Sequence, residues 1–239
     1  MKLFAYASLL CCIVAFSGCA ARSTSDPALK LKWASEDFSS KDNPVEAEKL
    51  IREAIDIYEL KRNQLGLAEA YRQYGLFYRS NAVSKYEEHY QRNGFLDEKV
   101  RFKDRYAKAI EYFNKSKDIY ASYGHYDILS NIYISLAKTY DIMNRQDEAC
   151  EAFSKSIESF RRIKMENQEA QEQRSQEISS YMEYVDLMKK QAGCPETPST
   201  EILKPAPKPV PTSPYAPPLE PAPAQAQTPQ PAAPASPAP

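Results

Sequence analysis

The segment that most constrains the fold of this chain runs from Tyr133 to Phe160 and reads as two helices joined by a short turn. In the first helix, large and small residues lie on one face at three-, four- and seven-residue steps: Tyr133, Leu136, Ala137 and Tyr140. The second helix repeats this arrangement with Ala149, Phe153 and Ser156. A helix pair of this kind cannot bury its apolar face alone, so we expect copies of it nearby.

The same pattern recurs elsewhere in the chain. A shift of the second helix by 40 residues matches it to Ala109, Phe113, Ser116 and Tyr120. A further shift by 62 residues matches these positions to Ala47, Ile51, Ala54 and Tyr58. The first helix, shifted by 62 residues, matches Tyr71, Tyr74, Gly75 and Tyr78. Unrelated amphipathic helices share a 3.6-residue period but need not share this register, so the matches indicate an internal repeat.

This pattern resembles the tetratricopeptide repeat (TPR), in which an aromatic residue or leucine, Leu-Gly and Tyr mark one helix and Ala, an aromatic residue and Ala mark the next. The resemblance covers about residues 45–163, with a spacing longer than the common repeat of about 34 residues. It implies an all-α, TPR-like helical-hairpin solenoid of about 2.5–3 repeats of about 40 residues, closed by a C-terminal capping helix. The repeat-defining core residues are Tyr71, Gly75, Tyr78, Ala109, Phe113, Tyr133, Ala137, Tyr140, Ala149 and Phe153.

One repeat carries an insertion. Tyr78 and Ala109 are 31 residues apart, whereas Tyr140 and Ala149 are 9 apart, so 22 residues, about 81–102, are added. We expect them to lengthen both helices by about 11 residues each, a projection of roughly 16 Å; a longer structureless loop is the alternative. The aromatic and histidine residues there either pack against each other or form a partner-binding surface, for which the candidates are Tyr86, His89, Tyr90, Phe95 and Phe102.

The helical domain is expected to span residues 44–193. Residues 19–43 read mainly as a tether, although Leu31, Ala34 and Phe38 allow a degenerate helix over about 28–39. Asp42-Asn43-Pro44 is a helix start signal, with Glu46 and Glu48 in the first turn, and the helix should run to about Asn63 before a turn at Gly66. At the other end, an apolar stripe with a polar opposite face predicts the capping helix: Ile178, Tyr181, Met182, Val185 and Met188.

The N-terminus resembles a bacterial lipoprotein signal. Residues 1–18 contain Lys2 and an apolar run too short for a typical membrane span, followed by Phe16-Ser17-Gly18-Cys19. The lipobox resemblance implies cleavage before Cys19 and covalent acylation of its thiol and amine, so a lipid such as palmitate would anchor the chain. Ala20 in place of Asp favours the outer membrane. An ordinary cleaved signal peptide is the alternative.

The mature chain would keep Cys150 and Cys194 as thiols. In an oxidising periplasm these two residues are candidates for a disulfide. The alternative is a buried Cys150 and an exposed or intermolecular Cys194, because the sequence does not show whether the two come within bonding distance.

Residues 194–239 form a Pro/Ala-rich tail, in which too few large apolar residues remain to make a core. We expect it to be disordered with polyproline II character. It is either an inert linker or a segment that docks into a partner groove or contacts the cell wall.

The composition argues against several functions. The net charge is −1, which gives no general attraction for nucleic acid. Only His89 and His125 are present, so no zinc spacing exists, and no Gly-rich phosphate loop occurs. We therefore expect no enzyme, no metal and no cofactor other than the lipid on Cys19.

The sequence predicts a non-enzymatic outer-membrane lipoprotein, with its domain in the periplasm or at the cell surface, that scaffolds or assembles an envelope complex such as secretion, pilus or motility machinery. A stable structural subunit of such a complex, or an adaptor for peptidoglycan or a peptidase, is the alternative. Its expected partners are the membrane, through the lipid, and other envelope proteins.

Overall fold

The computed structural model of the chain describes residues 24–97, 100–163 and 168–195. The expected signal peptide 1–18, the lipidation site Cys19 and the tail from residue 196 lie outside these ranges. The regular elements within the described ranges are all helical: α2 (Pro27–Ser39), α3 (Pro44–Leu60), α4 (Gln64–Arg79), α5 (Asn81–Lys85), α6 (Glu87–Asn93), η2 (Phe102–Asp104), α7 (Arg105–Tyr123), α8 (Tyr126–Ile142), α9 (Gln146–Arg161) and α10 (Gln168–Gln191).

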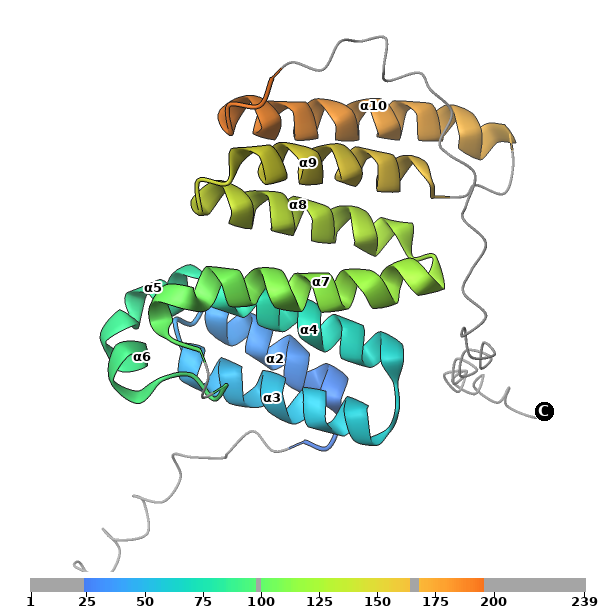
Figure 1. Ribbon diagram of the computed structural model, residues 1–239. Helices are drawn as coiled ribbons and strands as arrows, with labels where there is room; N and C mark the ends of the chain where they lie inside the picture. Colours follow the sequence, from blue (N-terminus) through green and yellow to red (C-terminus); the bar gives the residue numbers. More distant parts are fainter. Residues whose placement is uncertain (1–23, 98–99, 164–167, 196–239) are drawn as a thin grey trace, which may run out of the picture. The chain divides into compact units, whose positions relative to one another are not determined.

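The helices form stacked hairpins. The most extensive packing joins α2 with α3, α4 with α7, and α8 with α9, while α3–α4 and α7–α8 contacts join one hairpin to the next (Figure 1). The all-α hairpin solenoid expected from the repeat pattern is therefore confirmed. In each pair we call the first member the A helix (α2, α4, α8) and the second the B helix (α3, α7, α9).

Small residues let the paired helices approach closely. A Cβ atom on Gly75 of α4 would lie 2.6 Å from the Phe113 ring of α7, so only glycine fits there. Most of the repeat-defining residues are buried, and Tyr71, Tyr133 and Tyr140 pack partly buried against the same core. Gly66 also serves packing, because a side chain on it would overlap the Tyr58 ring. The turn itself is made by Arg62, whose φ is 53°, and α3 ends at Leu60 rather than near Asn63.

The first hairpin begins earlier than the predicted boundary at residue 44. The segment 27–39, predicted to be mainly tether, forms α2, and Leu31, Ala34 and Phe38 are buried against α3 and α4. Asp26 caps the helix by accepting a hydrogen bond of 2.9 Å from the Ala28 N–H. The alternative of a helix over about 28–39 is therefore the correct one, because three apolar residues on one face provide enough burial to order it.

The predicted extended hairpin over 81–102 is wrong. Helix α4 stops at Arg79 because Ser80 adopts an extended backbone, and its hydroxyl caps α5 by accepting a hydrogen bond from the Val83 N–H. Two short helices, α5 and α6, follow, and Gly94 (φ 74°) turns the chain back toward α7. The insertion thus folds against the end of the first two hairpins, where α5 contacts both α2 and α4.

Helix α10 closes the described part of the array against α9. The Tyr181 ring stacks on Phe160 with centroids 3.9 Å apart, and Val185 and Met188 are buried. Cys150 and Cys194 form a disulfide, with their Cα atoms 5.6 Å apart. Beside it, the Gln146 amide donates to the carbonyls of Ala192 and Gly193. The start of α9 is therefore fastened to the end of α10.

None of the helices in the described ranges is both long and apolar enough to cross a bilayer.

We predict that loss of the disulfide loosens α10 in particular. The bond links residues 44 positions apart, and closing a loop of this size contributes about 2–4 kcal/mol. The double substitution Cys150→Ser/Cys194→Ser should therefore lower the opening free energy measured by amide hydrogen exchange in α10 by about this amount. The effect on α2–α8 should be smaller. The unsubstituted chain treated with dithiothreitol is the control and should behave like the variant. Equal exchange in oxidised and reduced chains would contradict the prediction.

Candidate functional site

Three of the five residues predicted to bind a partner lie in the core. Tyr90, Phe95 and Phe102 are buried, and only Tyr86 and His89 reach the surface. Phe95 stacks on Tyr90 at 4.3 Å and meets the Tyr78 ring at 4.9 Å. The prediction of a surface made by all five is therefore wrong, because the inserted aromatic rings gain more by burial against α4 than by exposure on a projection.

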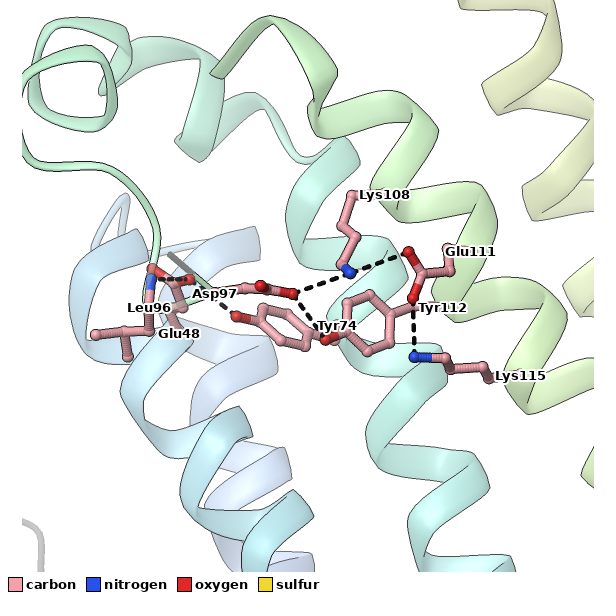
Figure 2. A network of polar contacts seen from close by, with 8 residues as sticks. All are labelled: Glu48, Tyr74, Leu96, Asp97, Lys108, Glu111, Tyr112 and Lys115. Carbon is pink, nitrogen blue, oxygen red and sulfur yellow. Dashed lines mark hydrogen bonds and ion pairs between the residues drawn. The ribbon is translucent and has the colours of Figure 1, made fainter. Parts of the chain in front are cut away.

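A polar network fastens the insertion to the array (Figure 2). We call it the polar anchor and define it by Glu48, Tyr74, Asp97, Lys108, Glu111, Tyr112 and Lys115. Glu48 Oε1 accepts hydrogen bonds from the Tyr74 hydroxyl at 2.9 Å and from the Leu96 backbone N–H at 2.8 Å. One carboxylate on α3 thus holds both α4 and the inserted segment.

The rest of the polar anchor joins Asp97 of the inserted segment to four residues along α7. Lys108 Nζ lies 3.0 Å from Asp97 Oδ2 and 2.9 Å from Glu111 Oε2. Glu111 Oε1 also lies 2.8 Å from Lys115 Nζ. The Lys115 ammonium in turn lies 4.9 Å from the centre of the Tyr112 ring. Each cation and carboxylate in this chain of contacts therefore has a neighbour of opposite charge (Figure 2).

Burial alters the acidity of these groups. It raises the pKa of Glu48 to about 7, although the hydrogen bonds from Tyr74 and Leu96 act in the opposite direction. It also raises the pKa of Tyr112 to about 12 and that of Tyr74 well above its ordinary value. Glu48 is 3% exposed, and its carboxylate accepts hydrogen bonds from Tyr74 and Leu96. The polar anchor is thus suited to holding the insertion in place rather than to acting on a substrate.

A second feature is an open groove of about 440 Å³ between the A helices α2 and α4. Its lining residues are Ala28, Leu31, Lys32, Ser35, Glu36, Tyr58, Glu69 and Gln73. Lys32 is exposed on its α2 wall, and Glu36 is partly exposed there. On the α4 wall, Glu69 binds Arg72 through two hydrogen bonds. The groove therefore presents both signs of charge around an apolar floor.

Gln73 lines this groove and carries a buried amide oxygen. Its Nε2 donates to Glu69 Oε1 at 2.9 Å, which fixes the orientation of the amide because a carboxylate can only accept. Its Oε1 is buried and has no hydrogen-bond partner among the described residues. A buried acceptor of this kind is costly unless a donor reaches it. Because Oε1 is buried, a ligand N–H reaches it only if the Gln73 side chain moves.

Both features were missed by reasoning from the sequence. Glu48 reads as a first-turn acid at a helix N-terminus, yet it shares a buried face with Ile51 and Ile55 at three- and seven-residue steps. Gln73 likewise lies on the face of Ala70 and Phe77. A polar residue in register with a buried stripe was the available signal, and it does not reveal the contacts of that residue.

The remaining sequence candidates do not converge. His89 contacts Asn93 and the Tyr90 ring on α6, while His125 precedes α8 and meets the Tyr120 ring. Across residues 24–97, 100–163 and 168–195, no three His, Cys, Asp or Glu side chains gather in a way that could hold a metal ion. Cys19, the expected lipidation site, lies outside these ranges.

A family model described as tetratricopeptide repeat matches residues 101–162. This range covers α7, α8 and α9 and includes the segment that first indicated the repeat. The chain therefore contains tetratricopeptide repeats, which typically mediate protein–protein interaction rather than catalysis. No curated protein and no solved structure matches the chain.

We predict that Glu48 makes stability depend on pH. The pKa of Glu48 is raised from 4.5 to about 7 in the folded state. Between these two pH values the folded chain keeps the proton on Glu48, whereas the unfolded chain has lost it. The free energy of unfolding should therefore fall as pH rises from about 4.5 to about 7, by up to about 3 kcal/mol for this group. Glu48→Gln keeps the acceptor oxygen but cannot ionise, so it should remove this contribution and be the more stable chain at pH 8.

The measurement is urea unfolding of both chains between pH 4 and pH 8. Glu46→Gln, on the same helix and outside the polar anchor, is the matched control and should follow the unsubstituted chain. A stability difference between Glu48→Gln and the unsubstituted chain that stays constant over this range would contradict the prediction.

Proposed function

We propose that this tetratricopeptide-repeat protein is a non-enzymatic outer-membrane lipoprotein that acts as a protein–protein interaction scaffold or assembly factor for a cell-envelope complex. The observation that carries the binding role is the α2–α4 groove with the unpartnered acceptor of Gln73. The fold alone does not specify a partner, since one scaffold serves many functions. The groove does specify the chemistry that a partner must bring.

When a partner segment binds, the Gln73 side chain turns toward the groove and its Oε1 accepts an N–H donor of that segment. A backbone amide of an extended peptide is the simplest such donor, because every residue except proline carries one. Beside it, the exposed Lys32 attracts an acidic side chain of the partner. Apolar contact with Leu31 and the Tyr58 ring completes the proposed recognition.

The envelope location rests on two independent observations. The sequence Phe16-Ser17-Gly18-Cys19 resembles a lipobox, which supports an anchor on Cys19. The Cys150–Cys194 disulfide suits an oxidising compartment such as the periplasm, because the cytosol keeps thiols reduced. Together they support a lipid-anchored protein whose helical domain lies outside the cytosol.

We predict that Gln73→Met weakens partner capture without weakening the fold. The substitution removes the unpartnered acceptor and also the hydrogen bond from Nε2 to Glu69, which keeps its two hydrogen bonds from Arg72. These two changes oppose each other, so the free energy of unfolding should stay about level. If a partner N–H uses Oε1, binding should fall by about tenfold, the effect of one lost hydrogen bond to a buried group. The measurements are thermal unfolding and the yield of partners co-purified from solubilised envelopes.

Gln91→Met is the matched control, because Gln91 is exposed on α6 and away from the groove lining. Both variants should retain the unfolding temperature of the unsubstituted chain or exceed it. If the two variants capture partners equally well, the groove is not the binding site.

We predict that metabolic labelling with palmitate depends on Cys19. The unsubstituted chain should carry label and sediment with the outer-membrane fraction, because the acyl chains provide stable anchoring. Cys19→Ser should lose both properties, whereas Cys150→Ser/Cys194→Ser should keep the label. Label that persists in Cys19→Ser would exclude the lipoprotein assignment while leaving the groove proposal standing.

A further inference from the structure

The buried carboxyl of Glu48 lies at the boundary between the repeat array and the inserted segment. On the array side it accepts a hydrogen bond from the Tyr74 hydroxyl of α4, and on the other side it accepts one from the Leu96 backbone N–H (Figure 2). The inserted Tyr90 is also near, because the Glu48 charge adds to the effect of burial in raising the pKa of the Tyr90 phenol. Departure of the inserted segment would therefore give water access to Glu48.

The insertion is built so that it can separate from the array as a unit. Helix α6 packs against α5 and η2, which lie at the two ends of the insertion. Its contact with α4 is made by rings, with Tyr90 and the following Phe95 both edge-on to Phe77. The pairs α3–α4 and α4–α7 pack on each other directly. These three helices can therefore stay together when the segment around α6 moves away.

The charged groups around Glu48 do not compensate fully for its burial. Burial is the largest cause of its raised pKa, and the nearby carboxylate of Asp97 raises it further. Arg52 on the same helix acts in the opposite direction. Lys108 of α7 lies 3.0 Å from Asp97 Oδ2 and so balances that carboxylate. An ionised Glu48 is thus less favourable in the closed arrangement than in water.

The other titratable groups packed around this region are neutral or paired. Burial raises the pKa of the phenols that face Glu48 from α4 and α6, so they carry no charge near neutral pH: Tyr74, Tyr78 and Tyr90. Helix α2, which also packs on α3, contributes the buried Asp37, whose carboxylate lies 3.4 Å from Lys41 Nζ. Glu48 is therefore the group at this boundary whose charge changes near neutral pH.

We propose that the insertion is a pH-sensitive clasp, which protonated Glu48 keeps closed on the array and which ionisation of Glu48 favours releasing, so that the rings of Tyr90 and Phe95 become uncovered. The pKa of Glu48 is about 7 in the closed form and returns toward 4.5 when water reaches the carboxyl. Below pH 4.5 both forms hold the proton, and above pH 7 neither does. Between these values the ratio of open to closed chains rises with pH, by up to about 300-fold.

Release of the clasp is distinct from partner capture at the α2–α4 groove. None of Glu48, Tyr90 and Phe95 belongs to the groove lining. Opening would uncover Phe77 of α4 together with the two inserted rings, because these three rings meet one another. The proposal thus adds an aromatic surface whose exposure depends on pH to a scaffold whose groove does not.

Native-state amide hydrogen exchange of the full chain between pH 5 and pH 8, corrected for the intrinsic exchange rate, tests the proposal. Hydrogen-bonded amides in the insertion report its opening: those of Tyr90, Gly94 and Leu96. Their protection should fall on the order of 100-fold over this range. It should also be lower at each pH than the protection of buried amides in α4 and α7, since the insertion opens while the array stays folded.

Two results would overturn the proposal. Equal protection of the insertion and of α4 and α7 at every pH would mean that the segment opens only when the whole domain unfolds. Protection that does not change with pH would mean that Glu48 does not control the opening. Both results come from the unsubstituted chain, so they do not require any variant to fold.

Substitution of Glu48 identifies the group responsible. Glu48→Gln keeps an acceptor oxygen for Tyr74 and Leu96 but cannot ionise, so protection of the insertion should no longer fall between pH 5 and pH 8. Glu46→Gln, on the same helix and outside the polar anchor, is the matched control and should keep the full dependence on pH. A Glu48→Gln chain with the same dependence as the control would also contradict the proposal.

Discussion

The structure depends on how closely paired helices approach where one of them carries a small residue. The Phe113 ring occupies the space that a side chain at position 75 would need, so it can lie there only because residue 75 is glycine. Fully buried alanines serve the other hairpins in the same way, such as Ala54 of α3 and Ala137 of α8. The stacking of one hairpin on the next extends this packing, so each unit completes the core of its neighbour.

The insertion shows the same drive toward burial. Extending two helices into solvent would leave Tyr90, Phe95 and Phe102 on a thin hairpin with little to cover them. Folding back against the array instead buries all three, with Tyr90 and Phe95 against Phe77 of α4. This requires polar backbone of the inserted segment to enter the core, and the buried carboxyl of Glu48 satisfies one such group, the Leu96 N–H. The raised pKa of Glu48 is the consequence of that burial.

The α2–α4 groove combines charged side chains with an apolar floor, and Gln73 beside it carries a buried amide oxygen with no hydrogen-bond partner among the described residues. At the other end of the described array, α10 exposes Tyr184 and Leu187. The disulfide fastens α10 to α9 and so keeps this helix in place.

The sequence by itself determined the hairpin repeat, its register and its core, because residues such as Gly75, Phe113 and Ala137 recur at fixed spacings that only one packing explains. Tertiary structure alone decided that 27–39 joins the array, that the insertion folds inward, and that Glu48 and Gln73 are buried. The physical reason is that helical periodicity reports which face of a helix is covered and not what covers it. Whether a polar residue on a buried face has a hydrogen-bond partner, and which residue that partner is, depends on segments distant in sequence.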